Sequence, residues 1–221
     1  MALPAIAVEE STADELVATI TELAKDLKIG PAYDESTEMG PLVNAEHFAF
    51  VNSWLDKSID EGAVVVLDGR TVEVEGHEGG FFMGPTVFDH VKPEMSCGNE
   101  EVFGPVLYIK RVADFNEGVG LINSSEFANG ASIFTQSGYY AREFARRIDA
   151  GMVGVNVGIP VPISVFPFSG HKNSFFGDLH TMGRDGVAFF TETKAVTSYW
   201  YNEADLRGEK VGTWEGTITR K

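Results

Sequence analysis

The chain has 221 residues, of which 43% are hydrophobic, so it can bury the core of one large domain and global disorder is excluded. Its formal net charge of −16, from 33 acidic and 17 basic residues, argues against nucleic acid or an anionic membrane as a partner, because both bind concentrated positive charge. The one cysteine, Cys97, rules out an internal disulfide and favours a reducing cytoplasm, and no apolar run approaches the roughly 20 residues that cross a bilayer.

The N-terminal part of the chain predicts a short strand followed by two helices. Residues 5–8 have the pattern of a strand, and Ser11 and Thr12 then offer side chains that can cap a helix. Apolar residues at helical spacing continue this helix until a Gly-Pro pair ends it. Asn44 is expected to cap a second helix, which also carries apolar residues at helical spacing.

The middle of the chain indicates strands that alternate with helices. Val64–Leu67 is a continuous apolar run, which is typical of a buried strand, and the alternation of apolar and acidic residues at 71–75 predicts an exposed hairpin arm. Later strands are predicted at residues 81–88, 106–112, 131–135 and 152–157, and helices at 114–123 and 139–149. This order predicts βαβ units around a parallel sheet, and therefore an α/β fold.

The last third of the chain departs from this pattern. Residues 159–176 contain three prolines and four phenylalanines and predict a long ordered loop, of the kind that forms sites at the carboxyl ends of sheet strands. The segment from Lys194 to Trp200 predicts a lone strand, so a second subunit is expected to pair with it and form a homo-oligomer. The polar tail offers Trp214 as an apolar anchor. The five histidines show no metal-ligand spacing, so no metal site is expected and they are expected to lie scattered on the surface.

Glu101 and Phe103 are the candidate binding residues, in the run Asn99-Glu100-Glu101-Val102-Phe103-Gly104-Pro105-Val106. A carboxylate accepts two hydrogen bonds at once, which suits a vicinal ribose diol. An aromatic residue two positions later in an extended segment projects to the same side, where it can pack against a flat ring. The same residues also fit a solvated acidic turn followed by a core phenylalanine, so the run alone leaves both interpretations open.

This run resembles the E-E-[IV]-F-G-P-V segment of the aldehyde dehydrogenase family, and other short motifs resemble that family in the same order over roughly 190 residues. They are Gly40-Pro41-Leu42-Val43, Gly84-Pro85-Thr86-Val87, Phe134-Thr135, Gly154-Val155-Asn156 and Thr193-Lys194-Ala195-Val196-Thr197. The resemblance implies an α/β, parallel-sheet catalytic domain over residues 1–185, a linker and oligomerisation strand over 186–200, and a polar C-terminal tail over 201–221. It also implies that Glu101 and Phe103 contact the cofactor NAD.

The loop after residue 156 resembles that of one branch of the family, the CoA-acylating methylmalonate-semialdehyde dehydrogenases. It carries the branch's V-N-x-x-I-P-V-P, F-x-F-[ST]-G and S-F-x-G-D patterns, in residues 155–162, 166–170 and 174–178. Gly158 stands where proline is usual, and Pro167 where a serine often separates the phenylalanines, which leaves the fine substrate preference open. The resemblance implies that NAD oxidises a malonate-type semialdehyde, that the acyl group passes to CoA and that CO₂ is lost. Phe166 and Phe168 then line the aldehyde site, with simple core packing as the alternative.

In the family, the nucleophilic cysteine stands immediately before a Met-Ala-Leu run like the one that opens this chain. We therefore expect the second half of an enzyme, lacking that nucleophile and the nucleotide-binding domain, and inactive alone, so no catalytic residue is assigned. Cys97 has acidic neighbours that would raise its pKa, which indicates an ordinary loop thiol. Two alternatives remain open, a non-catalytic assembly subunit and a fragment of a hydrolytic aldehyde dehydrogenase.

Overall fold

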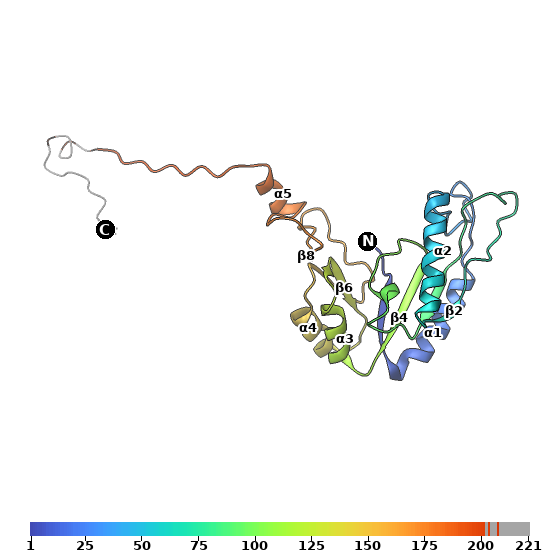
Figure 1. The fold of residues 1–221 in the computed structure, drawn as a ribbon. Helices are drawn as coiled ribbons and strands as arrows, with labels where there is room; N and C mark the ends of the chain where they lie inside the picture. The colour runs from blue at the N-terminus through green and yellow to red at the C-terminus, as the bar shows by residue number, and fades with distance from the viewer. Residues whose placement is uncertain (202, 204–206, 208–221) are drawn as a thin grey trace.

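The computed structural model describes residues 1–201, 203 and 207, and the largest element in it is a four-stranded sheet (Figure 1). The strand order is β1-β4-β3-β2, with β1 at Ala5–Glu9, β2 at Val64–Leu67, β3 at Thr86–Asp89 and β4 at Val106–Val112. β4 pairs in parallel with β1 and β3, as predicted, but β2 pairs antiparallel with β3. The prediction of a buried strand at residues 64–67 is wrong, because Val64 is exposed and the other three residues are only half-buried, and β2 also departs from the predicted parallel sheet. The connection at residues 68–85 contains no helix, and a parallel crossover usually needs one.

Two long helices pack on the sheet, α1 at Glu10–Lys25 and α2 at Ala45–Asp60. Successive strand residues point to opposite faces, so the core is divided into two halves. Val87 and Ile109 belong to the half that contains α1 residues, whereas their neighbours Phe88 and Tyr108 belong to the half that contains α2 residues. The second half also holds the short 3₁₀ turn η1 at Ser96–Gly98, which leads toward the candidate binding residues.

The two helix starts are capped differently. Asn44 caps α2 as predicted, because its side-chain oxygen accepts a backbone N–H of the first turn at 2.8 Å. The prediction that Ser11 and Thr12 cap α1 is wrong. The strand β1 runs directly into the helix, so the N-cap position falls on Glu9, which makes no side-chain capping hydrogen bond. Thr12 instead lies inside the first turn and donates its hydroxyl to the Glu9 carbonyl at 3.1 Å.

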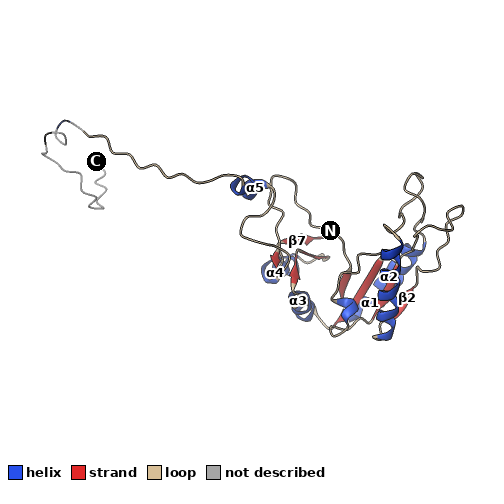
Figure 2. Ribbon diagram, turned by 45° about the horizontal axis from the view of Figure 1, so that its top comes forward, coloured by secondary structure: helices blue, strands red, loops and turns tan. Residues whose placement is uncertain are grey.

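A smaller layer stands beside the main sheet (Figure 2). Its elements are α3 at Phe115–Asn123, β5 at Phe127–Ala128, β6 at Gly130–Ile133, α4 at Gly138–Arg147 and β7 at Met152–Val155. β6 and β7 pair in parallel, as the βαβ prediction requires, and α3 and α4 enclose a small core around Val119 and Phe144. Within the described residues no strand pairing joins this layer to the main sheet, and the strands form three separate sheets rather than the one predicted parallel sheet.

The loop that follows β7 contains a short strand before it reaches α5 at Gly183–Phe189. This strand, β8 at His171–Lys172, pairs antiparallel with β5, so the predicted uninterrupted loop is interrupted once. Beyond α5 the chain leaves the body of the molecule as an extended arm (Figure 1). Within the described residues, the segment from Lys194 to Trp200 forms no strand. Trp214 and nearly all of the tail lie outside the described residues.

The predicted hairpin arm at residues 71–75 is wrong. The hydrogen bonds of this segment close local turns, such as the one from the His77 amide to the Val74 carbonyl at 3.0 Å, and no strand forms there. His77 also meets the Tyr33 hydroxyl at 2.8 Å, which ties two surface loops together. Within the residues that the structure describes, no helix is long and apolar enough to cross a membrane.

Candidate functional site

Glu101 and Phe103 lie in the short connection between η1 and β4. Val102 is buried in the core half that contains α2, whereas its neighbours on both sides are exposed, and Phe103 is 78% exposed. The alternative of a core phenylalanine is therefore excluded. The buried Val102 anchors the connection, so Glu101 and Phe103 are held at the surface by a fixed point between them.

The backbone of Phe103 is left-handed, with φ at 56°, which is uncommon for an aromatic residue. Its carbonyl faces Nε2 of His47 at 2.8 Å, and because a carbonyl only accepts, the Nε2 nitrogen donates. The two rings also meet edge to face, with centroids 6.4 Å apart. His47 lies in the first turn of α2, so the helix that Asn44 caps also fixes the backbone of Phe103.

Gly104 brings the same connection close to α2. A Cβ at this position would lie 2.9 Å from both Cγ atoms of Val51, which is fully buried. Only glycine allows that approach, so the Gly-Pro pair sets how closely the connection packs on the helix. The Pro105 carbonyl then accepts from the Thr86 amide at 2.8 Å, which aligns the start of β4 with β3.

Glu101 has the chemistry of a ligand-binding carboxylate. It is exposed, and no hydrogen bond or ion pair joins it to any residue that the structure describes. Both carboxylate oxygens are therefore available to accept from a diol. With the exposed Phe103 ring two positions away, the connection presents an unpaired carboxylate and an exposed aromatic ring.

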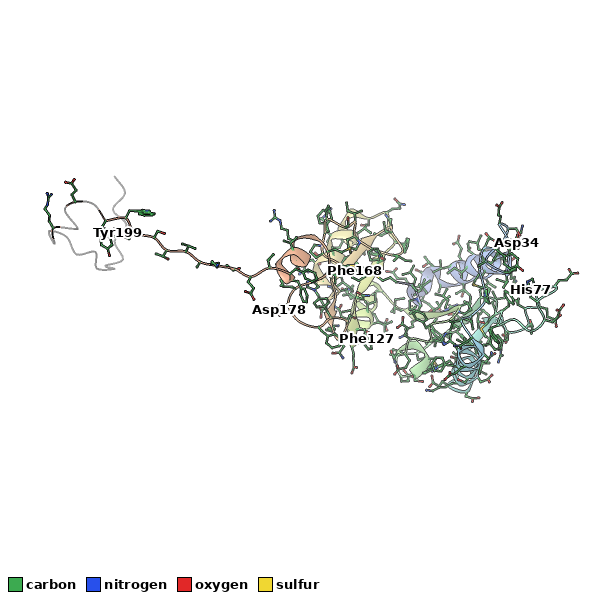
Figure 3. All side chains as sticks on the ribbon, turned by 90° about the horizontal axis from the view of Figure 1, so that it is seen from above. Asp34, His77, Phe127, Phe168, Asp178 and Tyr199 are labelled. Carbon is green, nitrogen blue, oxygen red and sulfur yellow. The ribbon has the colours of Figure 1, made fainter. Side chains whose placement is uncertain are left out.

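The second candidate pair, Phe166 and Phe168, lies in the loop after β7. Phe166 is exposed and Phe168 is half-buried, so neither is a core residue. Figure 3 shows Phe168 in the smaller layer, on the other side of the body of the molecule from His77. Pro167 between them borders a shallow hollow of about 400 Å³, and β7 and the proline-rich loop form the rest of its wall. The side chains that line the hollow are apolar, and none of them is charged.

The first residue of the chain lies close to this loop. A Cβ added at Gly130 would meet Met1 Cε at 2.8 Å and Pro160 Cγ at 3.2 Å. A Cβ added at Gly158 would likewise meet Leu3 Cδ1 at 3.1 Å. Residues 1–3 therefore pack against the same loop that carries Phe166 and Phe168.

Cys97 is not a loop thiol, because it lies in η1 and is fully buried. Burial raises the pKa of its thiol, the nearby Glu61 carboxylate raises it further, and a hydrogen bond with Ser58 opposes both. The direction of the pKa shift agrees with the prediction, although burial rather than acidic neighbours is its main cause. A protonated, inaccessible thiol is a poor nucleophile.

The histidines are not merely scattered surface residues. His47 holds Phe103, and His171 meets the Asp149 carboxylate at 2.8 Å. The ring of His180 lies between Asp185 and the Gly170 carbonyl. The sequence carried one usable signal, since Asn44 three residues earlier places His47 in a first helical turn. Among the described residues, no group of three or more acidic, histidine or cysteine side chains can hold a metal ion.

The structure keeps the two candidate pairs on different elements, and no hydrogen bond or ring contact among the described residues joins Glu101 or Phe103 to Phe166 or Phe168. The first pair lies in the connection between η1 and β4, beside the first turn of α2, and the second pair lies in the loop after β7.

The aldehyde dehydrogenase family model matches residues 1–196. Malonate-semialdehyde dehydrogenase 2 of Oceanobacillus iheyensis is 48% identical over 200 residues, which are 90% of this chain and 41% of the relative. The crystal structure of methylmalonate-semialdehyde dehydrogenase from Oceanimonas doudoroffii superposes with a TM-score of 0.86 at 42% identity, over 92% of this chain and 42% of that one. A structure from Sinorhizobium meliloti 1021, assigned to a methylmalonate-semialdehyde dehydrogenase and complexed with NAD, superposes with a TM-score of 0.87 at 42% identity. The match covers 90% of this chain and 41% of that one. The chain thus spans about two fifths of the relatives that it matches. Because the family model covers most of its length, the chain belongs to the aldehyde dehydrogenase family.

Proposed function

We propose that this chain is the C-terminal part of an NAD-dependent, CoA-acylating methylmalonate or malonate-semialdehyde dehydrogenase. The reaction converts a semialdehyde, CoA and NAD to an acyl-CoA, CO₂ and NADH. The observation that carries the proposal is the exposed, unpaired carboxylate of Glu101 beside the exposed, left-handed Phe103. The branch is supported by the loop patterns at residues 155–178 and by the names of the similar proteins.

Each candidate residue has a distinct role in this proposal. The two oxygens of Glu101 accept from the hydroxyls of the nicotinamide ribose, and the Phe103 ring packs against the adjacent flat ring. When bound, NAD supplies the acceptor for the hydride that leaves the aldehyde carbon. Phe166 and Phe168 form an apolar wall of the aldehyde site, and CoA enters as the second substrate.

The nucleophile is a cysteine that precedes residue 1 in the complete protein. A thiolate is required because the same atom must attack the aldehyde and then carry the acyl group as a thioester. Support comes from Met1, which packs beside Gly130 and Pro160, so a residue joined to it lies near the proline-rich loop. Cys97 is buried with a raised pKa and does not replace it. The 221-residue chain alone is therefore expected to be inactive.

The arm beyond α5 is proposed to pair with a second subunit from Lys194 to Trp200. Its support is the extended, exposed course of this segment, and the ring of Tyr199 in it meets the ring of Tyr201, just beyond it, at a centroid distance of 4.9 Å. The same observation favours the second candidate function, in which the chain is a non-catalytic assembly subunit that adds this strand to a complete partner. We also propose a cytoplasmic location, because the one cysteine of this chain is a free, buried thiol.

The cofactor assignment is tested in the complete enzyme with Glu101→Gln, and Glu100→Gln is the matched control because it removes the adjacent exposed carboxylate. Loss of a charged hydrogen-bond acceptor is expected to raise the KM for NAD about 10- to 100-fold and to leave the KM for the semialdehyde unchanged. Equal effects of the two variants would refute the assignment of Glu101. Activity without CoA would favour a hydrolytic enzyme instead.

A further inference from the structure

A short segment, residues 180–185, holds the loop that carries Phe166 and Phe168. The Phe168 amide donates to the Thr181 carbonyl at 2.8 Å, and the Gly183 amide donates to the Ser164 carbonyl at 3.1 Å. Gly183 has φ at 57°, and a Cβ there would lie 2.9 to 3.0 Å from the backbone of residues 165–167. The segment is thus pressed directly against the backbone that positions the two phenylalanines.

His180 is the side chain that locks this segment in place. Its Nδ1 faces the Asp185 carboxylate at 3.2 Å, and its Nε2 faces the Gly170 carbonyl at 3.3 Å. The ring also stacks on Phe175, with centroids 4.1 Å apart. Both partners of the ring nitrogens are acceptors, so a neutral ring can donate to only one of them and a protonated ring to both. The His180 imidazole therefore contacts Asp185 of α5, the Gly170 carbonyl and the Phe175 ring, and so joins α5 to two parts of the loop.

Asp185 fixes the orientation of that ring. One of its oxygens accepts from the His180 backbone amide at 3.3 Å as well as facing Nδ1. The carboxylate lies in the first turn of α5, immediately after the Met182-Gly183 turn. By contrast, Asp178, which is labelled in Figure 3, is exposed and makes no hydrogen bond among the described residues.

We propose that His180, held by Asp185, is a positioning residue that sets the place of Phe166 and Phe168 in the aldehyde site. This inference rests on the proposed function, because only that function gives the two phenylalanines a substrate. His180 touches neither the substrate nor the cofactor in this proposal. It acts through the Gly170 carbonyl and through the backbone hydrogen bonds that Thr181 and Gly183, which follow it, make with the loop.

The first test measures amide hydrogen exchange in the 221-residue chain. His180→Ala should make the Phe168 and Gly183 amides exchange about tenfold faster, since it removes the contacts that hold the segment 180–185, which carries the acceptor of the first bond and the donor of the second. Asp178→Asn is the control and should leave both rates unchanged. Unchanged exchange in His180→Ala would overturn the proposal whatever the chain catalyses.

The second test uses the complete enzyme and separates positioning from general stability. His180→Ala should raise the KM for the semialdehyde about tenfold with the KM for NAD unchanged, because only the loop moves. Asp185→Asn keeps an acceptor and should have a smaller effect, and the double variant should be no worse than His180→Ala alone. A wild-type enzyme that does not oxidise the semialdehyde refutes the proposed function. An active enzyme whose KM values both stay unchanged in His180→Ala refutes the inference.

Discussion

Two phenylalanines with opposite surroundings give the sharpest test of the structure. Phe88 is fully buried and stacks on Tyr108, with ring centroids 5.5 Å apart, so Phe88→Ala should cost about 3–5 kcal/mol of unfolding free energy. Phe103→Gly should differ completely. It loses an edge contact with His47 worth about 0.5–1 kcal/mol and adds freedom to the unfolded chain worth about 0.4–1 kcal/mol. It relieves a left-handed backbone strain of about 1–2 kcal/mol, so the sum lies within about 1 kcal/mol of zero.

The assay is urea unfolding of the 221-residue chain, followed by far-UV circular dichroism, with the midpoint and the slope both recorded. The slope should stay the same in both variants, so that the change in midpoint reports stability. In the complete enzyme, Phe103→Gly should still weaken NAD binding although it leaves the fold intact. A loss as large as that of Phe88→Ala would mean that the Phe103 ring packs in a core, and the assignment of a surface site would be wrong.

Three further changes test the same structure by urea unfolding. Burial alone would raise the pKa of Asp89, but hydrogen bonds, led by the one from Arg111, lower the pKa below its ordinary value. The stability that the ionised Asp89 contributes is therefore present above about pH 4 and is lost as the pH falls through the lowered pKa. Asp89→Asn should therefore flatten the loss of stability below about pH 4, and an unchanged profile would contradict the ion pair of Asp89 with Arg111. Asn156→Ala removes two hydrogen bonds between the side chain and the Thr135 backbone, at 2.9 and 3.0 Å, and should cost about 1–3 kcal/mol. Gly104→Ala places a Cβ 2.9 Å from two buried valine methyls and should also cost about 1–3 kcal/mol, whereas a neutral result would show that the turn packs loosely.

Much of the fold could be predicted from local sequence signals. Asn44 capped α2 as expected because the capping hydrogen bond lies within a few residues of it. The strand pattern at Val106–Val112 was equally clear, since its side chains are buried on both faces. The errors have long-range causes. Ser11 and Thr12 are good capping residues, but β1 feeds directly into α1 and moves the helix start. β2 has the composition of a buried strand, yet its place at an antiparallel edge depends on the loop at residues 68–85.

The candidate site was only partly visible in the sequence. Glu101 and Phe103 were found from their spacing and from the family resemblance, but the left-handed backbone of Phe103 was not. That backbone depends on His47, 56 residues away, and no local pattern reveals the pairing. His180 was missed for the same reason, because its role comes from the Gly170 carbonyl and from a stacked ring. Residues that act through tertiary contacts leave little trace in residue type and spacing.

The central claim is that this chain completes a CoA-acylating semialdehyde dehydrogenase, and one reconstitution tests it most directly. The purified 221-residue chain is refolded together with an upstream half that ends in the expected cysteine. NADH formation from malonate semialdehyde is then measured with and without CoA. Our account predicts activity that appears only when the two halves are mixed and that requires CoA. Stable association of the halves without any activity would contradict it and would favour a non-catalytic assembly subunit.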